Sequence, residues 1–403
     1  MKFLRKIKAR LQLKKRVREG RRRHQMKRLA KKYPLIEDQV LFCSFRGKQY
    51  SDNPRAISEK LHELDPSVKI LWLIGNSRDQ ELRKAMAIPG YVKVVEYGTP
   101  AADRAMVQSA VWVYNNDLPY GTWKRKNQYY IQTWHGDRGF KLVRYDAQAV
   151  MGDAGYKALY MVEDKICNLC VAGSDEGESK YRTAFAYHGE IMKEGCPRND
   201  CLIHRDLEYA LSIRKRLGLG DEQILLYAPT FRDQKKGKQK VDLDFAALKK
   251  ALEESTGKPW KILVRGHSLA GKLVYGAEEN AVMDVSGYRD MAELLMITDL
   301  LISDFSSTVN DYALMEKPIV LYLNDYEEYR KENRELKYDA GNLGYPVAYN
   351  MEELLRFVRE MNSMDFQKIC RSVLDGYGAS ESGRASEAVA GRILEFLKNN
   401  SEK

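Results

Sequence analysis

The sequence lacks the motifs of several large nucleotide-binding and hydrolase families. It has no G-x-G-x-x-G, so NAD or FAD binding has no support, and no G-x-x-x-x-G-K-[ST], which argues against a P-loop nucleotidase. It also has no G-x-S-x-G nucleophile elbow and no H-E-x-x-H zinc motif. We therefore expect no cofactor and no metal ion, because no carboxylate cluster in the sequence calls for one.

Long apolar runs and abundant cysteine are also missing. No run of about 18 uncharged apolar residues occurs, so no transmembrane helix is predicted. The charged N-terminus is not followed by an apolar core of roughly 7–15 residues, so no signal peptide is predicted. The six cysteines do not suggest a disulfide scaffold, which fits a reduced, cytoplasmic protein. Cys167 and Cys170 form a C-x-x-C without a second pair or a nearby His, and are predicted as core residues.

The positive charge of the chain is concentrated at its N-terminus. Residues 1–34 hold 16 Lys and Arg and one acid, Glu19, so this segment has a net charge of +15. The whole chain has a net charge of +11. The remaining body is therefore slightly acidic, and the basic pI does not by itself indicate a nucleic-acid partner. Phe3, Ile7 and Leu11 share one face of a predicted basic amphipathic helix, a pattern that suits an anionic membrane surface. The residues predicted to contact the membrane are Phe3, Leu4, Ile7, Leu11, Lys14, Lys15 and Arg16. An RNA-binding arm and a disordered tail are the alternatives.

Short apolar runs alternate with helical segments along the rest of the chain, which predicts an α/β protein with parallel sheets. We predict a basic arm over 1–34, an N-terminal Rossmann-like domain over 35–205 and a C-terminal Rossmann-like domain over 206–403. Residues 351–372 and 381–398 are predicted as C-terminal helices of the second domain. Two Rossmann-like domains that face a cleft form the GT-B architecture of many glycosyltransferases and related transferases.

Residues 300–322 have the strongest local pattern in the chain. A buried strand over 300–302 runs into a Ser-rich turn, a helix that ends near 315–317 and a second buried strand over 319–323. Ser306 and Ser307 fall at the helix start, at the carboxyl end of a strand, where ligands of α/β sheets bind. A simple helix cap is the alternative use of these serines.

Other polar groups suited to phosphate follow neighbouring predicted strands. Thr230 and Arg232 come after one strand, and Arg265 and His267 after another. Together with Ser306 and Ser307 they predict a site for a nucleotide diphosphate. His135 also ends an apolar strand, in the other predicted half, so both histidines are expected to point into the cleft between the domains.

Five ordered motifs resemble those of the CDP-glycerol glycerophosphotransferases of teichoic acid synthesis. They are QTWHGDRGFK at 132–141, GCPRND at 195–200, YAPTFRD at 227–233, VRGH at 264–267 and TDLLISDFSSTVNDYALMEKPIVLY at 298–322. The resemblance covers roughly 40–395. The chain departs from the familiar W-H-G-T-P-L-K by the sequence DRGFK after W-H-G, and from R-x-H-P by a serine after the histidine.

The resemblance implies that the domain over 35–205 is the acceptor domain and that the domain over 206–403 binds the CDP-polyol donor. It also implies a role for each matched residue. His135 matches the general base on the acceptor hydroxyl, and His267 matches the histidine that contacts the donor pyrophosphate. Ser306 and Ser307 match the serines that hold donor phosphates. Thr230, Arg232 and Asp304 are expected to support them, and Arg265 is expected to stabilise charge on the pyrophosphate.

The activity implied is transfer of glycerol phosphate from CDP-glycerol to a lipid-linked glycan or polyol-phosphate acceptor, with release of CMP. The enzyme is expected at the cytoplasmic face of the cell membrane, held there peripherally by its arm. CDP-ribitol is the alternative donor. A non-catalytic membrane- or RNA-binding protein with a GT-B-like body is the alternative from another class. The sequence leaves open the number of units added and the oligomeric state.

Overall fold

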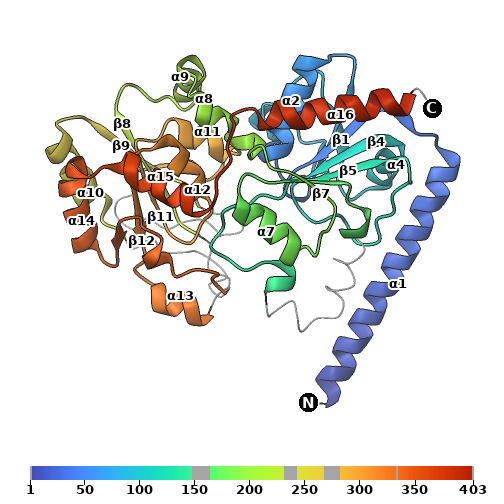
Figure 1. Ribbon diagram of the computed structural model, residues 1–403, viewed down its shortest axis with the longest axis horizontal. Coiled ribbons are helices and arrows are strands. Elements are labelled where there is room, and N and C mark those ends of the chain that lie inside the picture. The colour runs from blue at the N-terminus through green and yellow to red at the C-terminus, as the bar shows by residue number, and fades with distance from the viewer. Residues whose placement is uncertain (1, 148–163, 231–242, 267–281, 333–334, 402–403) are drawn as a thin grey trace.

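The computed structural model describes residues 2–147, 164–230, 243–266, 282–332 and 335–401. In this part of the chain the strands form two parallel sheets, one in each half of the molecule (Figure 1). The predicted α/β class with two Rossmann-like halves is confirmed. Among the described residues, those that follow the carboxyl ends of strands include the predicted site residues His135, Thr230, Arg265, Asp304 and Ser306.

The first sheet has seven strands in the order β3-β2-β1-β4-β5-β6-β7. Their apolar sequences are continuous rather than alternating because both faces of the sheet are covered. In β4, for example, all six residues are buried. The strands are β1 Ile36–Cys43, β2 Lys69–Ile74, β3 Lys93–Glu96, β4 Ser109–Tyr114, β5 Tyr129–Gln132, β6 Leu169–Val171 and β7 Glu190–Met192. The helices of this half before the crossover are α1 Lys2–Lys32, α2 Asp52–Leu64, α3 Gln80–Ala85, α4 Pro100–Gln108 and α7 Asp175–Thr183.

The second sheet has six strands in the order β10-β9-β8-β11-β12-β13. They are β8 Gln223–Ala228, β9 Trp260–Val264, β10 Val282–Asp284, β11 Leu300–Ser303, β12 Ile319–Tyr322 and β13 Val347–Ala348. The helices that follow the first half are α8 Asp200–His204, α9 Leu207–Arg216, α10 Phe245–Thr256, α11 Met291–Met296, α12 Thr308–Tyr312, α13 Tyr326–Glu332, α14 Met351–Glu360, α15 Phe366–Gly376 and α16 Ala385–Ser401. The 3₁₀ turns are η1 Phe45–Gly47, η2 Arg144–Asp146, η3 Pro197–Asn199, η5 Ala313–Met315, η6 Ala340–Asn342 and η7 Met361–Ser363.

Several helices begin where a capping side chain precedes an apolar stripe. Thr99 accepts from Ala102 N at the start of α4, whose first residue is Pro100. Asp206 accepts from Tyr209 N at the start of α9, as the sequence predicts. These caps satisfy N–H groups that the first turn of a helix leaves unpaired.

The last helix, α16, lies in the first half of the molecule, beside α2 (Figure 1). Its apolar stripe, which includes Val389 and Ile393, joins the core beneath the first sheet. The carboxylate of Asp200 accepts from the N–H groups of Ala385 and Ser386 at 3.0 and 2.7 Å, and so caps the helix after the crossover. The prediction that 206–403 forms one domain is therefore wrong for α16.

The single predicted helix over 351–372 is also wrong, because the structure has two helices there. α14 ends at Glu360, and Asp365 caps α15 by accepting from Lys368 N at 3.0 Å. The 3₁₀ turn η7 lies between them, with Met361 buried against the second sheet. A local capping carboxylate thus interrupts a helical periodicity that looks continuous in the sequence.

The basic N-terminal segment forms helix α1, and the second half of this helix is part of the folded body. Met26 and Ala30 are buried in the core formed with β4 and α4. Arg22 donates to Asp103 Oδ1 at 2.5 Å and to the carbonyl oxygen of Tyr120 at 2.8 Å. The prediction of a separate arm over 1–34 is therefore corrected, since buried apolar and ion-pair contacts fix residues 22–30 to the first half.

Candidate active site

His135 lies just past the carboxyl end of β5, which lies between β4 and β6 in the first sheet. The chain leaves the strand through Trp134, whose φ of 48° is in the left-handed region. The side chain of Asn53 holds this turn, because its Nδ2 donates to the carbonyl oxygens of Thr133 and Trp134 at 3.2 and 3.1 Å.

The ring of His135 is fixed in one orientation. Its Nδ1 lies 2.6 Å from the carbonyl oxygen of Asn115, and the rings of Phe45 and Trp134 lie 5.3 and 4.3 Å from it, centroid to centroid. A carbonyl oxygen only accepts, so Nδ1 carries the proton and Nε2 has the free electron pair. Burial lowers the pKa of His135, which keeps the imidazole neutral near pH 7. Such a group can accept a proton.

In the second sheet, three predicted turns follow adjacent strands. The sheet places β9, β8 and β11 next to one another, so the turns that contain Arg265, Thr230 and Ser306 share one edge. Asp304 is buried, and its Oδ1 accepts from Thr230 N at 2.8 Å, so that it ties two of the turns together. The prediction that these turns are neighbours is confirmed, and phosphate binding by them stays a prediction.

Arg265 is partly buried beneath this edge. Its Nη2 donates to the carbonyl oxygen of Tyr288 at 3.2 Å. Burial lowers the pKa of Arg265 to about 10, so the guanidinium stays charged at neutral pH. Arg232 and His267, the other two predicted residues of these turns, lie outside the described residues.

The two serines of the third turn have different surroundings. Ser306 Oγ accepts from Thr308 N at 3.3 Å and donates to Thr308 Oγ1 at 3.0 Å, so Ser306 makes the local turn bond. Ser307 occupies the N-cap position of α12 but makes no side-chain cap hydrogen bond. The alternative that both serines merely cap the helix is therefore wrong for Ser307.

The loop after His135 meets the serine turn at the junction of the two halves. A Cβ atom built on Gly136 would lie 3.7 Å from Ser307 Oγ, and one built on Gly139 would lie 3.8 Å from Ser307 Cβ. The W-H-G loop that follows the first sheet and the serine turn of the second sheet therefore lie against each other. Within the described residues, no group of three or more His, Cys, Asp or Glu side chains is arranged to hold a metal ion.

Comparison with known proteins identifies the family. The family model for CDP-glycerol:poly(glycerophosphate) glycerophosphotransferase matches residues 25–395. The chain belongs to this glycerophosphotransferase family.

Three relatives illustrate the match. The teichoic acid poly(glycerol phosphate) polymerase of Bacillus subtilis is 30% identical over 91% of this chain and 50% of its own length. The teichoic acid glycerol-phosphate transferase of Staphylococcus aureus is 28% identical over 88% of this chain and 92% of its own. A structure of the wall teichoic acid polymerase TagF, 27% identical, covers 96% of this chain and 98% of that one with a TM-score of 0.82. The chain spans about half the length of the first two curated relatives it matches.

This glycerophosphotransferase family member has a buried ionic cluster that the sequence did not predict. Asp137, directly after W-H-G, accepts from Gly173 N at 3.0 Å and from Ser174 Oγ at 2.5 Å. Lys180 donates to the carbonyl oxygens of Gly136, at 2.8 Å, and of Asp137. Burial lowers the pKa of Lys180, and its ammonium fixes the backbone between His135 and the serine turn.

Arg138 joins this loop to the second half of the molecule. Its side chain is fully buried, with Nη2 2.6 Å from Glu381 Oε1 and 3.3 Å from Asp311 Oδ1 of α12. Asn310, also of α12, donates to the carbonyl oxygen of Arg138 at 2.5 Å. The only signal in the sequence was the charged pair Asp137-Arg138 inside a glycine-rich motif, where the familiar members have T-P-L.

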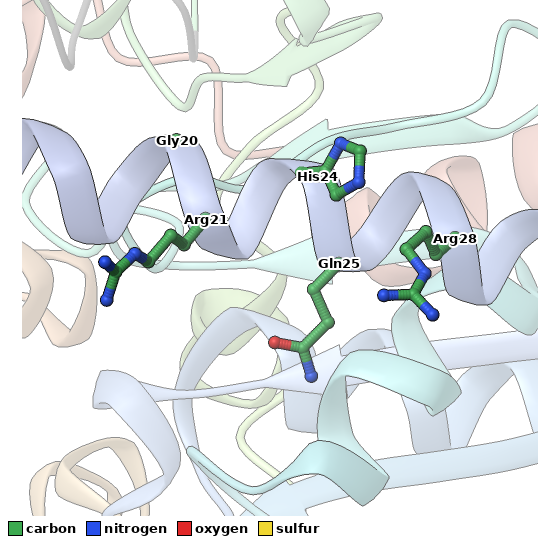
Figure 2. Close-up of a pocket in the computed structure, with 5 residues that line it drawn as sticks. All are labelled: Gly20, Arg21, His24, Gln25 and Arg28. Atoms are coloured by element: carbon green, nitrogen blue, oxygen red, sulfur yellow. The ribbon is translucent and has the colours of Figure 1, made fainter.

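Helix α1 presents basic groups on its surface. Figure 2 shows a surface pocket of this helix lined by Gly20, Arg21, His24, Gln25 and Arg28. Arg21, Gln25 and Arg28 project from one side of the helix, as their spacing requires. The side chains of the predicted membrane-contacting residues, from Phe3 to Arg16, lie outside the described part, so their role stays a prediction. No described helix is long and apolar enough to cross a membrane.

Proposed function

We propose that this chain transfers glycerol phosphate from CDP-glycerol to a hydroxyl group of a lipid-linked glycan or polyol-phosphate acceptor and releases CMP. Family membership supports the donor class. The observation that carries the proposal is the neutral His135, whose Nε2 has a free electron pair and whose following loop lies against the serine turn. Relatives named as teichoic acid polymerases and transferases support the acceptor class.

In the proposed step, the acceptor oxygen attacks the phosphorus that carries glycerol. The new O–P bond forms as the bond from this phosphorus to the bridging oxygen breaks, and CMP leaves with the bonding electrons. His135 Nε2 takes the hydroxyl proton. A general base of this kind contributes roughly 10²–10⁴-fold to the rate.

The second half supplies positive charge and hydrogen-bond donors for the donor diphosphate. Arg265 is cationic at neutral pH and lies on the same sheet edge as Thr230 and Ser306. Ser307 Oγ is not used as a helix cap and is available to donate to a phosphate oxygen. His267 and Arg232 are proposed to act beside them, as their motifs suggest. Such groups stabilise the charge that builds on the leaving phosphate.

The experiment is CMP release from CDP-glycerol and, separately, from CDP-ribitol, with a lipid-linked disaccharide acceptor and liposomes. Release from CDP-glycerol with loss in His135→Gln supports the proposal. Release from CDP-ribitol alone would replace glycerol by ribitol. Release from neither donor by folded protein would reject the assignment.

We further propose that the N-terminal part of α1 holds the protein peripherally on the cytoplasmic face of the membrane. Residues 1–34 carry a net charge of +15, and each cation near an anionic surface contributes on the order of 1 kcal/mol. The N-terminal part of α1 extends away from the body (Figure 1). The helix is anchored to the body from Arg22 on, so the extension would be presented at a fixed angle.

The test is removal of residues 2–16, which leaves the buried Met26 and Ala30 in place. The truncated protein is expected to lose sedimentation with liposomes that contain anionic lipid, and to keep turnover on a soluble acceptor analogue. Undiminished sedimentation would reject the anchor. Retained liposome binding with lost RNA binding would favour the nucleic-acid alternative.

A further inference from the structure

Three residues with strained backbone conformations surround His135. Phe45, Asp52 and Trp134 have φ values of 46°, 65° and 48°, in the left-handed region that residues other than glycine seldom adopt. Phe45 and Trp134 contact the His135 ring directly. Backbone strain of this kind persists where the surroundings impose it, often at functional sites. Asp52 is the one of the three that carries a charge, and the proposed mechanism has not used it.

Asp52 reaches His135 through one residue. Asp52 Oδ1 accepts from Asn115 Nδ2 at 3.1 Å, and the carbonyl oxygen of Asn115 lies 2.6 Å from His135 Nδ1. Asn115 is fully buried, and its Oδ1 accepts from Phe45 N at 2.9 Å. Both polar atoms of the Asn115 side chain, Oδ1 and Nδ2, are therefore hydrogen-bonded. These bonds fix the residue, and with it the backbone carbonyl group that orients His135.

The charge of Asp52 is only partly engaged by its neighbours. Arg198 of η3 lies 3.8 Å from Asp52 Oδ1, but its guanidinium is closer to Asp311, at 3.0 Å from Nη2 to Oδ2. Among the described residues, the charged groups that act on His135 are Asp52 of α2, Asp117 after β4 and Arg198. Burial has the largest effect and lowers the pKa of His135, Arg198 also lowers it, and Asp52 and Asp117 raise it.

We propose that Asp52 is a positioning residue for His135. Through Asn115 it holds the imidazole in the tautomer protonated at Nδ1, and its charge stabilises the imidazolium that forms when Nε2 takes the acceptor proton. The catalytic part of this inference rests on the proposed function. The part that concerns the orientation and charge of the His135 ring does not rest on it, because both can be measured without substrate.

The test compares Asp52→Asn with Asp65→Asn, at the aspartate just past the other end of α2, whose carboxylate accepts only from Ser67 N and Oγ among the hydrogen bonds described. Asn keeps the size of Asp and tolerates a left-handed backbone. We expect kcat of Asp52→Asn to fall roughly tenfold with KM for CDP-glycerol unchanged, because the imidazolium is less stabilised. Asp65→Asn is expected to match the wild type.

The pH profile supplies a readout that a merely structural role would not move. His135 acts as a base in its neutral form, so activity is lost as pH falls through its pKa. Loss of the Asp52 charge lowers that pKa further, so the acid limb of kcat/KM moves to lower pH in Asp52→Asn. The same shift is expected in an NMR titration of labelled histidine, with His135→Gln used to assign the signal.

The outcomes separate the two proposals. Wild-type protein that releases no CMP would reject the proposed function, and the NMR titration would still decide the role of Asp52. Wild-type turnover and titration in Asp52→Asn would overturn the inference and leave the proposed function in place. If Asp52→Asn does not fold, the wild-type ¹⁵N shifts of His135 decide, because a ring protonated at Nε2 near neutral pH would overturn the inference.

Discussion

Arg138 Nη2 lies 2.6 Å from Oε1 of Glu381, and both side chains are buried. Arg138 belongs to the loop that follows His135, and Glu381 precedes the helix that crosses back to the first half. Glu381 Oε2 also accepts from Cys196 N at 2.9 Å. One buried ion pair therefore links the loop of the proposed base to the crossover that holds the two halves together.

Removal of the Glu381 charge should destabilise the protein strongly. Glu381→Ala leaves Arg138 buried with only Asp137 and Asp311 as counter-charges, and breaking such a pair costs about 3–5 kcal/mol. We expect a large loss in the free energy of unfolding by urea denaturation. Glu387→Ala, on the exposed surface of α16, is the control, and equal stability of the two variants would contradict the account.

The proposed base should be replaceable only at great cost to turnover. His135→Gln is expected to lower kcat by roughly 10²–10⁴-fold, with little change in thermal stability, because the amide cannot accept the proton. His188→Gln, at an exposed histidine outside the site, is the control. Turnover of His135→Gln within a few-fold of the wild type would remove His135 from the mechanism.

The pH dependence of turnover follows from the same residue. Burial lowers the pKa of His135 below its ordinary value of about 6.5, so the neutral base persists into mildly acidic solution. We expect kcat/KM to hold steady from pH 7 down through about 6.5 and to fall only below it. An acid limb centred above pH 7 would mean that a different group, or a charged His135, limits the reaction.

Ser306 and Ser307 should differ in which measurement they affect. Ser306→Ala removes the bond to Thr308 N and should cost about 0.5–1 kcal/mol of stability. The Ser307 side chain makes no cap hydrogen bond, so Ser307→Ala has none to lose. We therefore expect this variant to have a stability near that of the wild type and a higher KM for CDP-glycerol. The reverse pattern, with Ser307→Ala the less stable and KM unchanged, would identify Ser307 as a purely structural residue.

Arg22 contributes several of the hydrogen bonds that attach α1 to the body. Arg22→Ala removes its bonds to Asp103 and to the carbonyl oxygens of Pro119 and Tyr120, and should raise hydrogen exchange in the second half of α1. Arg21→Ala, one position earlier and exposed, is the matched control and should leave exchange unchanged. Equal exchange in both variants would show that Arg22 does not fix the helix.

The sequence could predict the sheets and the position of His135 because the evidence for both is local. Continuous apolar runs mark buried parallel strands, and a polar residue directly after such a run lies at the sheet edge. The neighbouring turns at Thr230, Arg265 and Ser306 follow from the same rule. The five ordered motifs then indicated the family.

The rest depended on contacts between distant segments. The apolar stripe of α16 does not state which sheet it covers, so its return to the first half was missed. Asp137 and Arg138 look like solvent-exposed loop charges until Ser174, Lys180 and Glu381 are seen around them. Met26 and Ala30 are apolar positions in a strongly basic helix, and only the packed α4 reveals that they are core.

The most direct test of the account is single-turnover CMP release from CDP-glycerol by wild-type protein and by His135→Gln, with a lipid-linked acceptor on liposomes. We predict rapid release by the wild type, and a rate at least about 100-fold lower for the variant with donor binding retained. Equal rates for the two proteins, or no release by folded wild-type protein, would contradict the account.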